Sequence, residues 1–279
     1  MASHNAKDPI RREAFILKQL SSLDEWRGSL VHRAIEKYLI PSLQERKLIS
    51  ESDLTEKTIT LAKKQFDFSE QQTYKDASFK KKDAGDSFLA LREHEYGISI
   101  PQIDIDNFYE DIRQCYKFLY SHTKFLRFLL DGDSYIAEPL INFKFNGCTL
   151  VAKLDLVMSY SSSKLCIIDW KISRSQTSDY SKQLNFYALA ALNKWRSYKV
   201  GDLFLVEANL LQGKLVKHFV RGENLLQIED LIYRSLLDIR ALTGDHKYNL
   251  DNLDDYEYAN SPMSCEYCKF EKMCVRFSS

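Results

Sequence analysis

The chain has 279 residues, which corresponds to one large domain or two small ones and is enough to bury a substantial core. Its 39 Lys and Arg residues balance 39 Asp and Glu residues, and the net charge of zero excludes a protein that coats nucleic acid through a strongly basic surface. The apolar runs are far shorter than the ~20 residues that a membrane span needs, and the polar residues 1–12 lack the apolar core of a secretory signal. We therefore expect a cytoplasmic globular protein with no membrane partner, and an enzyme with a local basic groove remains compatible with this composition.

The first part of the chain is predicted to be helical. Apolar residues recur at helical spacing over residues 26–40, and Pro41 is predicted to end this helix. Residues 42 to about 85 are charged and poorly patterned, and we interpret them as helices and loops. A second amphipathic helix is predicted over residues 106–130.

The pattern then changes to strands. Residues 135–145 and 149–160 alternate around Asn146-Gly147, a hairpin turn signal, and residues 165–172 are apolar enough for a central strand. A helix is predicted over 179–195, a second hairpin over 203–220 and a long amphipathic helix over 223–242. This order predicts an α/β fold.

Two acidic residues and a lysine lie on consecutive predicted strands. Strand alternation places Asp169 and Lys171 on one face, and Asp155 precedes them by one hairpin. Two converging carboxylates suit Mg²⁺ or Mn²⁺, which activates a water and clamps a phosphate oxygen, while a lysine stabilises developing negative charge. The alternative is a salt bridge on the surface of a strand pair. An aspartate within so apolar a run favours the site, because a buried carboxylate needs a partner or a metal.

Several further polar residues accompany this motif. His32 and Glu36 are four residues apart on one side of the first helix, where an imidazole can reach a metal or can lie at the edge of the core. Gln183 and Tyr187 have the same spacing on a later helix, where they can touch phosphate or can serve as surface and core residues. Glu138 either assists the metal site or caps an edge strand.

The cysteines are concentrated near one end of the chain. Three of the six, Cys265, Cys268 and Cys274, fall in the C-terminal tail. This spacing without a secretory signal indicates a metal or iron–sulfur site before a disulfide framework, with free thiols as the alternative.

Taken in order, these residues resemble the motifs of the PD-(D/E)XK nuclease superfamily, and most of all its RecB-type branch, which includes CRISPR-adaptation nucleases and iron–sulfur single-strand exonucleases. The matching motifs are G-x-x-x-H at Gly28 to His32, an Asp at Asp155, D-x-K at Asp169 to Lys171, and Q-x-x-x-Y at Gln183 to Tyr187. The resemblance implies a single nuclease-like domain over 1–279. Its restriction-endonuclease-like core would have the order αβββαβ and a mixed central sheet flanked by helices, with a helical insertion over 42–130 and a cysteine tail over 258–279.

The resemblance also implies roles for the site residues. His32, Asp155 and Asp169 would bind Mg²⁺ or Mn²⁺, Lys171 would be catalytic together with the two aspartates, and Gln183 and Tyr187 would bind substrate; Glu36 and Glu138 would support them. The chain departs from the family at Lys153, where a small Gly is common. A lysine there either adds affinity for phosphate or crowds the metal.

By the same resemblance, the tail cysteines would be three ligands of an iron–sulfur cluster, with Zn²⁺ or a vestigial site as alternatives. The family's fourth cysteine lies before the histidine helix, but here the first cysteine is Cys115, so Cys115 or a non-cysteine ligand would complete the set.

The implied function is a metal-dependent deoxyribonuclease that hydrolyses phosphodiester bonds in single-stranded DNA or at DNA ends, in defence or repair. The sequence contains no P-loop motif, so a motor would be a separate partner. The alternative is a nuclease-fold subunit of weak or no activity that binds DNA or assembles with a partner.

Overall fold

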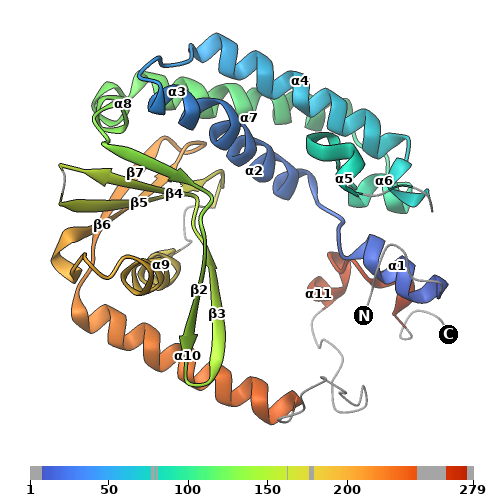
Figure 1. Ribbon diagram of the computed structural model, residues 1–279. Helices are drawn as coiled ribbons and strands as arrows, with labels where there is room; N and C mark the ends of the chain where they lie inside the picture. Colours follow the sequence, from blue (N-terminus) through green and yellow to red (C-terminus); the bar gives the residue numbers. More distant parts are fainter. Residues whose placement is uncertain are drawn as a thin grey trace. The chain divides into compact units, whose positions relative to one another are not determined.

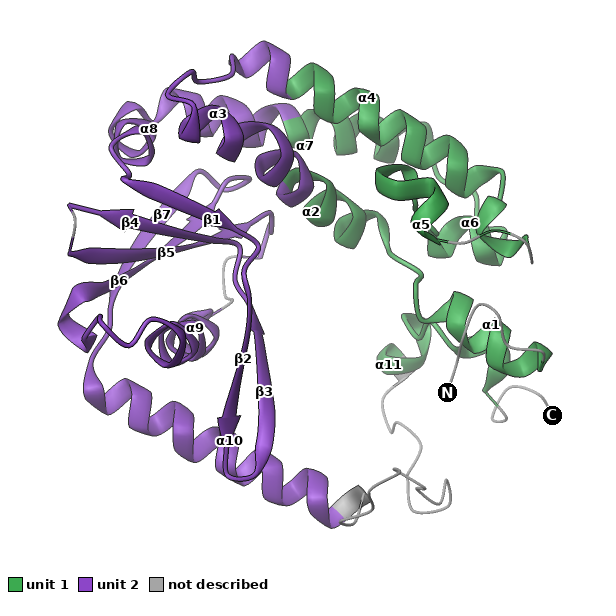
Figure 2. Ribbon diagram, in the orientation of Figure 1, with its two compact units in different colours: residues 1–31, 55–112, 257–279 green, residues 32–54, 113–256 purple. Residues whose placement is uncertain are grey.

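The computed structural model describes residues 8–76, 79, 81–161, 163–175, 179–243 and 262–274 (Figure 1). The chain forms two compact units (Figure 2): unit 1 comprises residues 1–31, 55–112 and 257–279, and unit 2 comprises residues 32–54 and 113–256. Within the described ranges, every helix is too short or too polar to cross a membrane. The predicted limits of the single domain, of the 42–130 insertion and of the 258–279 tail stay predictions, and residues 258–261 and 275–279 of that tail lie outside the described residues.

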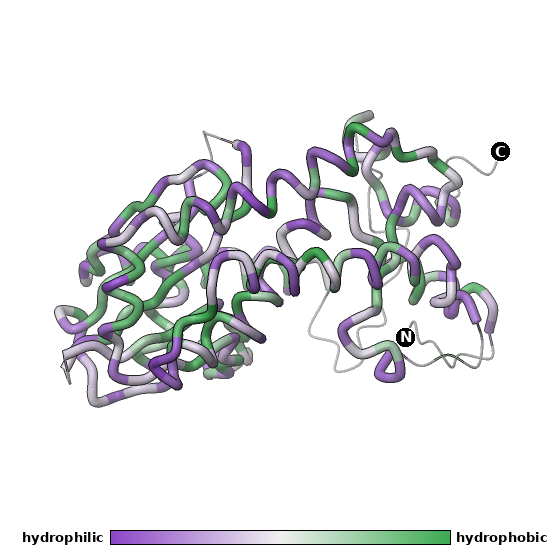
Figure 3. The backbone as a smooth tube through the Cα atoms, turned by 90° about the horizontal axis from the view of Figure 1, so that it is seen from above, coloured by the Kyte–Doolittle hydropathy of each residue, from purple (hydrophilic) through white to green (hydrophobic). Residues whose placement is uncertain are grey.

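Unit 1 is helical. It holds α1 (Pro9–Leu17), α5 (Lys81–Ala84), α6 (Arg92–Tyr96), α11 (Pro262–Glu266), and parts of α2 (Leu23–Ala34), α4 (Glu51–Glu70) and α7 (Gln102–Ser121). Hydrophilic and hydrophobic colours alternate along these helices (Figure 3), as expected when one side of each helix is buried. Trp26 is fixed by stacking on Phe108 at a centroid distance of 4.0 Å and by donating its indole N–H to Gln65 at 2.7 Å.

The helix that carries His32 does not end at Pro41, which corrects the prediction. After α2 the chain widens into one π-helical turn, η1 (Ile35–Leu39), and Pro41 then lies in the first turn of α3 (Ile40–Gln44). A proline is tolerated there because its missing N–H would have no partner within a helix that begins at that point. The π turn therefore lets the chain continue as helix through the proline.

The helix predicted over 106–130 is also two helices, because α7 ends at Ser121 and α8 spans Thr123–Leu130. His122 separates them and caps the second one, since its Nδ1 accepts the N–H of Phe125 at 3.2 Å.

Unit 2 contains a five-stranded sheet in the order β1-β4-β5-β6-β7 and a separate two-stranded ribbon, β2-β3. The strands are β1 (Ser134–Ala137), β2 (Leu140–Phe145), β3 (Cys148–Lys153), β4 (Leu156–Tyr160), β5 (Lys164–Lys171), β6 (Leu203–Asn209) and β7 (Lys214–Phe219). Only β5 and β6 pair in parallel, and the other neighbours are antiparallel.

The first predicted hairpin is bent, which corrects its description as two uninterrupted strands. The outgoing strand breaks at Glu138-Pro139 between β1 and β2, and the return strand breaks opposite it at Leu154-Asp155 between β3 and β4. Two backbone hydrogen bonds hold the bend closed: Glu138 N–H donates to the Asp155 carbonyl at 2.9 Å, and Leu154 N–H donates to the Pro139 carbonyl at 3.2 Å. The hairpin therefore leaves the sheet at this point and continues as the ribbon.

Helices cover both faces of the sheet (Figure 1). On one face α9 (Ser181–Lys194) packs through Leu184, Ala188 and Ala191 against β5 and β6, and α10 (Gly222–Thr243) packs against α9. On the other face Phe125 of α8 contacts Trp170 of β5 at a centroid distance of 6.0 Å. The predicted α/β fold with a mixed central sheet flanked by helices is thus confirmed.

Candidate active site

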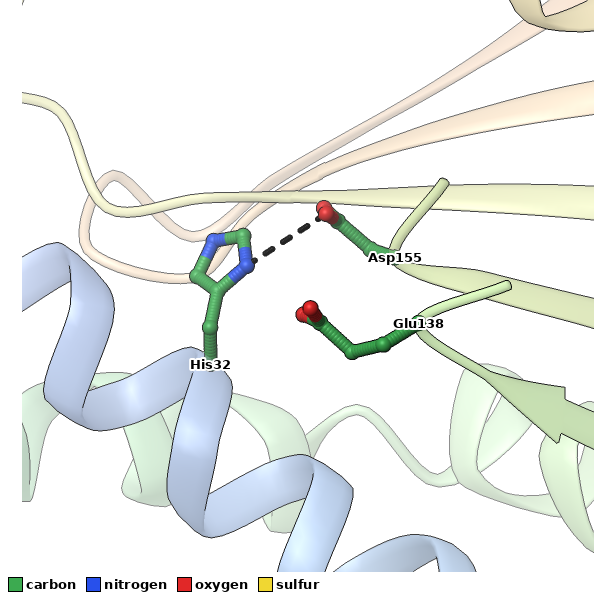
Figure 4. A group of neighbouring side chains, drawn as sticks. All are labelled: His32, Glu138 and Asp155. Carbon is green, nitrogen blue, oxygen red and sulfur yellow. Dashed lines mark ion pairs between the residues drawn. The ribbon is translucent and has the colours of Figure 1, made fainter. Parts of the chain in front are cut away.

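Three metal-ligating side chains point toward one another at the hairpin bend (Figure 4). His32 comes from α2, Glu138 follows β1 and Asp155 precedes β4, and one ligand atom from each lies within 4.8 Å of the others. Among the described residues, this is the only set of three or more His, Cys, Asp and Glu side chains that meets this criterion. The bend therefore gathers two carboxylates and an imidazole from three segments.

The backbone at this site is strained. Glu138 has a φ of 49°, in the left-handed region that residues other than Gly, Asn and Asp seldom adopt. The following Pro139 adds to this strain, because a residue before proline prefers an extended conformation. The two hydrogen bonds across the bend hold Glu138 in this conformation, which presents its carboxylate to the site.

Asp155 is fixed from two sides. Its Oδ1 lies 3.5 Å from Nδ1 of His32, and its Oδ2 accepts the backbone N–H of Trp170 at 2.8 Å. The first contact joins it to α2 and the second to the central strand β5. Asp155 is therefore oriented before any ligand arrives.

A chain of polar contacts runs beside this group. Lys171 Nζ lies 2.7 Å from Oδ2 of Asp169 and donates to Oε1 of Gln183 at 2.7 Å. Gln183 in turn donates from Nε2 to the hydroxyl of Tyr187 at 2.7 Å. The ring of Tyr180 lies 4.3 Å from the same ammonium. These contacts hold the Lys171 ammonium in place.

Asp169 is buried close to the negative charge of Asp155. Asp169 is only 1% exposed, and burial together with the nearby Asp155 carboxylate raises the pKa of Asp169 to about 6, although Lys171 and His32 oppose the rise. The pKa of Tyr187 is raised to about 12, mainly because the hydroxyl is buried and also because Asp169 and Asp155 are negatively charged. The site thus concentrates negative charge that a cation would neutralise.

These residues fit a divalent cation. His32, Glu138 and Asp155 supply one imidazole nitrogen and two carboxylates, a donor set that can hold a divalent cation, and His32 and Asp155 both act on the charge of the neighbouring Asp169. Asp169, which the sequence assigned to the ligand set, lies outside the group of three, and Glu138, which it assigned a supporting role, lies inside.

Two other expected residues occupy different positions. Glu36 forms an ion pair with Arg33 at 2.6 Å, within its own helix. Lys153 forms an ion pair with Glu138, and its side chain is otherwise largely exposed. Lys153 is thus placed at the rim of the group of three.

One buried acid beside the site was missed from the sequence. Glu207 of β6 is in register with Asp169 across the parallel pair, and its Oε2 lies 3.2 Å from Nε2 of His218 on β7. The signal that singled out Asp169, an acid inside an apolar strand, was also present at Glu207.

The tail cysteines and the group of three belong to different units of the chain. Cys265, Cys268 and Cys274 belong to unit 1, are partly exposed and form no disulfide, whereas Cys115 is buried in unit 2. In the described part of the tail the three sulfurs do not all lie within 4.8 Å of one another. The cluster or zinc site stays a prediction.

The sequence was compared with family models, with curated proteins and with solved structures. The family model of the PD-(D/E)XK nuclease superfamily matches residues 10–275. Solved structures that are similar include a putative exonuclease from Eubacterium rectale, at 13% identity and a TM-score of 0.37 over 83% of this chain and 92% of that one. Another is SSO0001, at 17% identity and a TM-score of 0.31 over 66% of this chain and 78% of that one. No curated protein matches.

Proposed function

The chain belongs to the PD-(D/E)XK nuclease superfamily, and we propose that it is a divalent-metal-dependent deoxyribonuclease that cleaves single-stranded DNA or DNA ends. The observation that carries this proposal is the convergence of His32, Glu138 and Asp155 beside the polar chain that orients Lys171. The preference for single strands or ends, the choice of Mg²⁺ or Mn²⁺, and a role in defence or repair with a separate motor partner rest on the resemblance.

Different residues of the chain would have different roles in hydrolysis. A cation held by His32, Glu138 and Asp155, with Asp169 nearby, would lower the pKa of a bound water and offset charge on the phosphate. Lys171, held by Asp169 and Gln183, presents an ammonium where negative charge develops during attack. Gln183 and Tyr187 position that ammonium rather than react.

The test compares the two lysines that begin and end β5. Labelled single-stranded and double-stranded oligonucleotides are incubated with Mg²⁺ or Mn²⁺, and cleavage is measured for the parent, Lys171→Ala and Lys164→Ala. Loss of one preorganised cation costs on the order of 3 kcal/mol of barrier, so Lys171→Ala should slow cleavage by roughly a hundredfold or more. Its DNA affinity should change little, because affinity comes from many phosphate contacts.

Lys164→Ala is the matched control, since Lys164 forms its ion pair with Asp202 at the opposite end of the same strand. It should cleave like the parent, and thermal unfolding checks that both variants are folded. If Lys171→Ala cleaves like the parent, the assignment of the site is wrong. If the parent binds DNA but does not cleave it with either metal, the protein is a binding subunit.

A further inference from the structure

The ribbon β2-β3 has two unlike faces. Ile141, Phe143 and Ala152 turn toward α9 and are buried in the core. The other face carries residues that alternate with these, and Leu140 and Val151 on it are 61% and 55% exposed. We call this the outer ribbon face and define it as Leu140, Asn142, Lys144, Thr149, Val151 and Lys153.

The outer ribbon face has a one-sided charge. It contains no acidic side chain, although the chain as a whole has as many acidic as basic residues. Lys153 stands at one end and Lys144 stands near the other. The face is therefore complementary to a polyanion.

The outer ribbon face is also continuous with the metal-ligating group. Lys153 forms an ion pair with Glu138, which is one of the three converging residues. Lys153 pairs with Leu140 across the ribbon, and Lys144 is four residues further along β2. Leu140 and Lys144 are therefore roughly 13 Å apart along the strand, at the usual rise per residue. A DNA strand whose phosphate binds a cation held by His32, Glu138 and Asp155 would lie along this face over a few nucleotides.

Apolar residues between the lysines favour a single strand over a duplex. A duplex turns its phosphates outward and its base faces inward, so it would leave Leu140 and Val151 without an apolar partner. A single strand exposes sugars and base faces, which can cover such side chains while its phosphates meet the lysines. Asn142 and Thr149 supply hydrogen-bonding groups between them.

We propose that the outer ribbon face is the path of the single-stranded DNA on one side of the phosphate that is cleaved. This inference rests on the proposed function, because it extends the substrate contact of that same site along the ribbon. It assigns Lys144, Asn142 and Val151 to DNA binding and not to the chemical step.

The test measures DNA affinity and cleavage separately. Binding of a labelled 12-nucleotide DNA is followed by fluorescence anisotropy in Ca²⁺ at several salt concentrations, for the parent, Lys144→Gln and Lys124→Gln. Lys124 is the matched control, because it is an exposed lysine of unit 2 on α8. Lys144→Gln should weaken binding roughly three- to tenfold and lower the salt slope by about 0.7, the loss of one single-strand phosphate contact. Lys124→Gln should match the parent.

Cleavage of substrates of different length adds a second readout. Lys144→Gln should slow cleavage of the 12-nucleotide DNA at low concentration but leave a dinucleotide unaffected, since a dinucleotide does not reach Lys144. If the parent binds and cleaves while Lys144→Gln behaves like Lys124→Gln, the inference is overturned and the proposed function survives. If duplex DNA or single-stranded RNA depends on Lys144 more strongly than single-stranded DNA does, the assignment of the partner is wrong. If the parent neither binds nor cleaves DNA, the proposed function falls and the inference falls with it.

Discussion

At the scale of single residues, the conformation of Glu138 places its carboxylate in the site but lowers the stability of the folded protein. Its left-handed backbone precedes Pro139, and its carboxylate lies near that of Asp155. A left-handed residue other than Gly or Asn costs about 1 kcal/mol or more, and two nearby carboxylates repel each other. The ion pair with the exposed Lys153 offsets little of this cost.

Replacing Glu138 with asparagine should therefore separate stability from activity. Asn tolerates the left-handed region and removes one negative charge, so Glu138→Asn should raise the free energy of unfolding by about 1 kcal/mol in metal-free protein. The same change removes one of the two carboxylates proposed to hold the cation and should weaken Mn²⁺ binding. Denaturant unfolding and Mn²⁺ titration measure the two effects, with Lys153→Gln as the control for the lost ion pair. A variant that is less stable but binds Mn²⁺ normally would contradict both parts.

The raised pKa of Asp169 predicts a pH dependence with a definite sign. Its folded pKa of about 6 exceeds the ordinary aspartate pKa of 3.8, so the folded protein holds a proton that the unfolded chain releases. Without metal, this group makes the folded state less stable as the pH rises from about 4 to 6, with no further change above that window. Comparing denaturant unfolding of the parent with that of Asp169→Asn at pH 4, 5, 6 and 7 should show this slope in the parent only.

The same proton should compete with the cation. At pH 6 about half of the Asp169 carboxyls are protonated, so Mn²⁺ binding should release protons there and weaken as the pH falls further. Calorimetric titrations in buffers of different ionisation enthalpy count these protons. Equal Mn²⁺ affinity at pH 5 and pH 7 would show that Asp169 does not act on the metal.

At the scale of elements, the sequence predicted the strands and helices but missed how they are interrupted. Hydrophobic periodicity located α9 and α10, because each of these helices packs one apolar side in the core, whereas a continuous apolar run located β5, which is buried on both faces. It did not predict the break at Glu138-Pro139, where Pro139 was a signal, because alternation continues on both sides of the bend. That break brings Glu138 into the site, and it depends on hydrogen bonds between segments distant in sequence.

The contacts of the C-terminal tail with α6 could not be predicted from hydrophobic periodicity either. Glu95 of α6 forms ion pairs with Lys272 at 2.9 Å and with Lys75 at 3.1 Å, and the Arg92 guanidinium donates to the Glu266 carbonyl at 2.6 Å. Burial alone would raise the pKa of Glu95, but the two lysines outweigh it and lower the pKa. These contacts within unit 1 attach the tail to α6.

Lys272→Ala should therefore loosen the tail. It leaves the nearly buried Glu95 carboxylate with one cation fewer, which should lower the free energy of unfolding by about 1–2 kcal/mol and speed proteolysis of the tail. The contribution of Glu95 is present above its unfolded pKa and is lost as the pH falls through its lowered folded pKa, so the difference from the parent should vanish in acid. Lys63→Ala, an exposed lysine on α4, is the control and should change neither quantity.

At the scale of the whole molecule, each unit is assembled from segments far apart in the chain. Unit 1 combines residues 1–31, 55–112 and 257–279, so folding must close long loops, and each closure carries an entropy cost. Ion pairs on the surface contribute little free energy to holding such segments together. A metal or cluster bound by the tail would contribute more, because its binding free energy adds to that of folding.

We therefore expect the three tail cysteines to bind one metal or cluster together. Cys265→Ser, Cys268→Ser and Cys274→Ser should each lose the same metal and lower the melting temperature by a similar amount, while DNA cleavage measured below that temperature changes less. Elemental analysis and visible absorption of protein purified without oxygen measure the metal, and broad brown absorption distinguishes an iron–sulfur cluster from zinc. Cys148→Ser, which alters a thiol of the ribbon in unit 2, is the control and should keep both metal and melting temperature. Parent protein that contains neither iron nor zinc, or three variants whose melting temperatures differ widely, would show that the cysteines act as separate thiols.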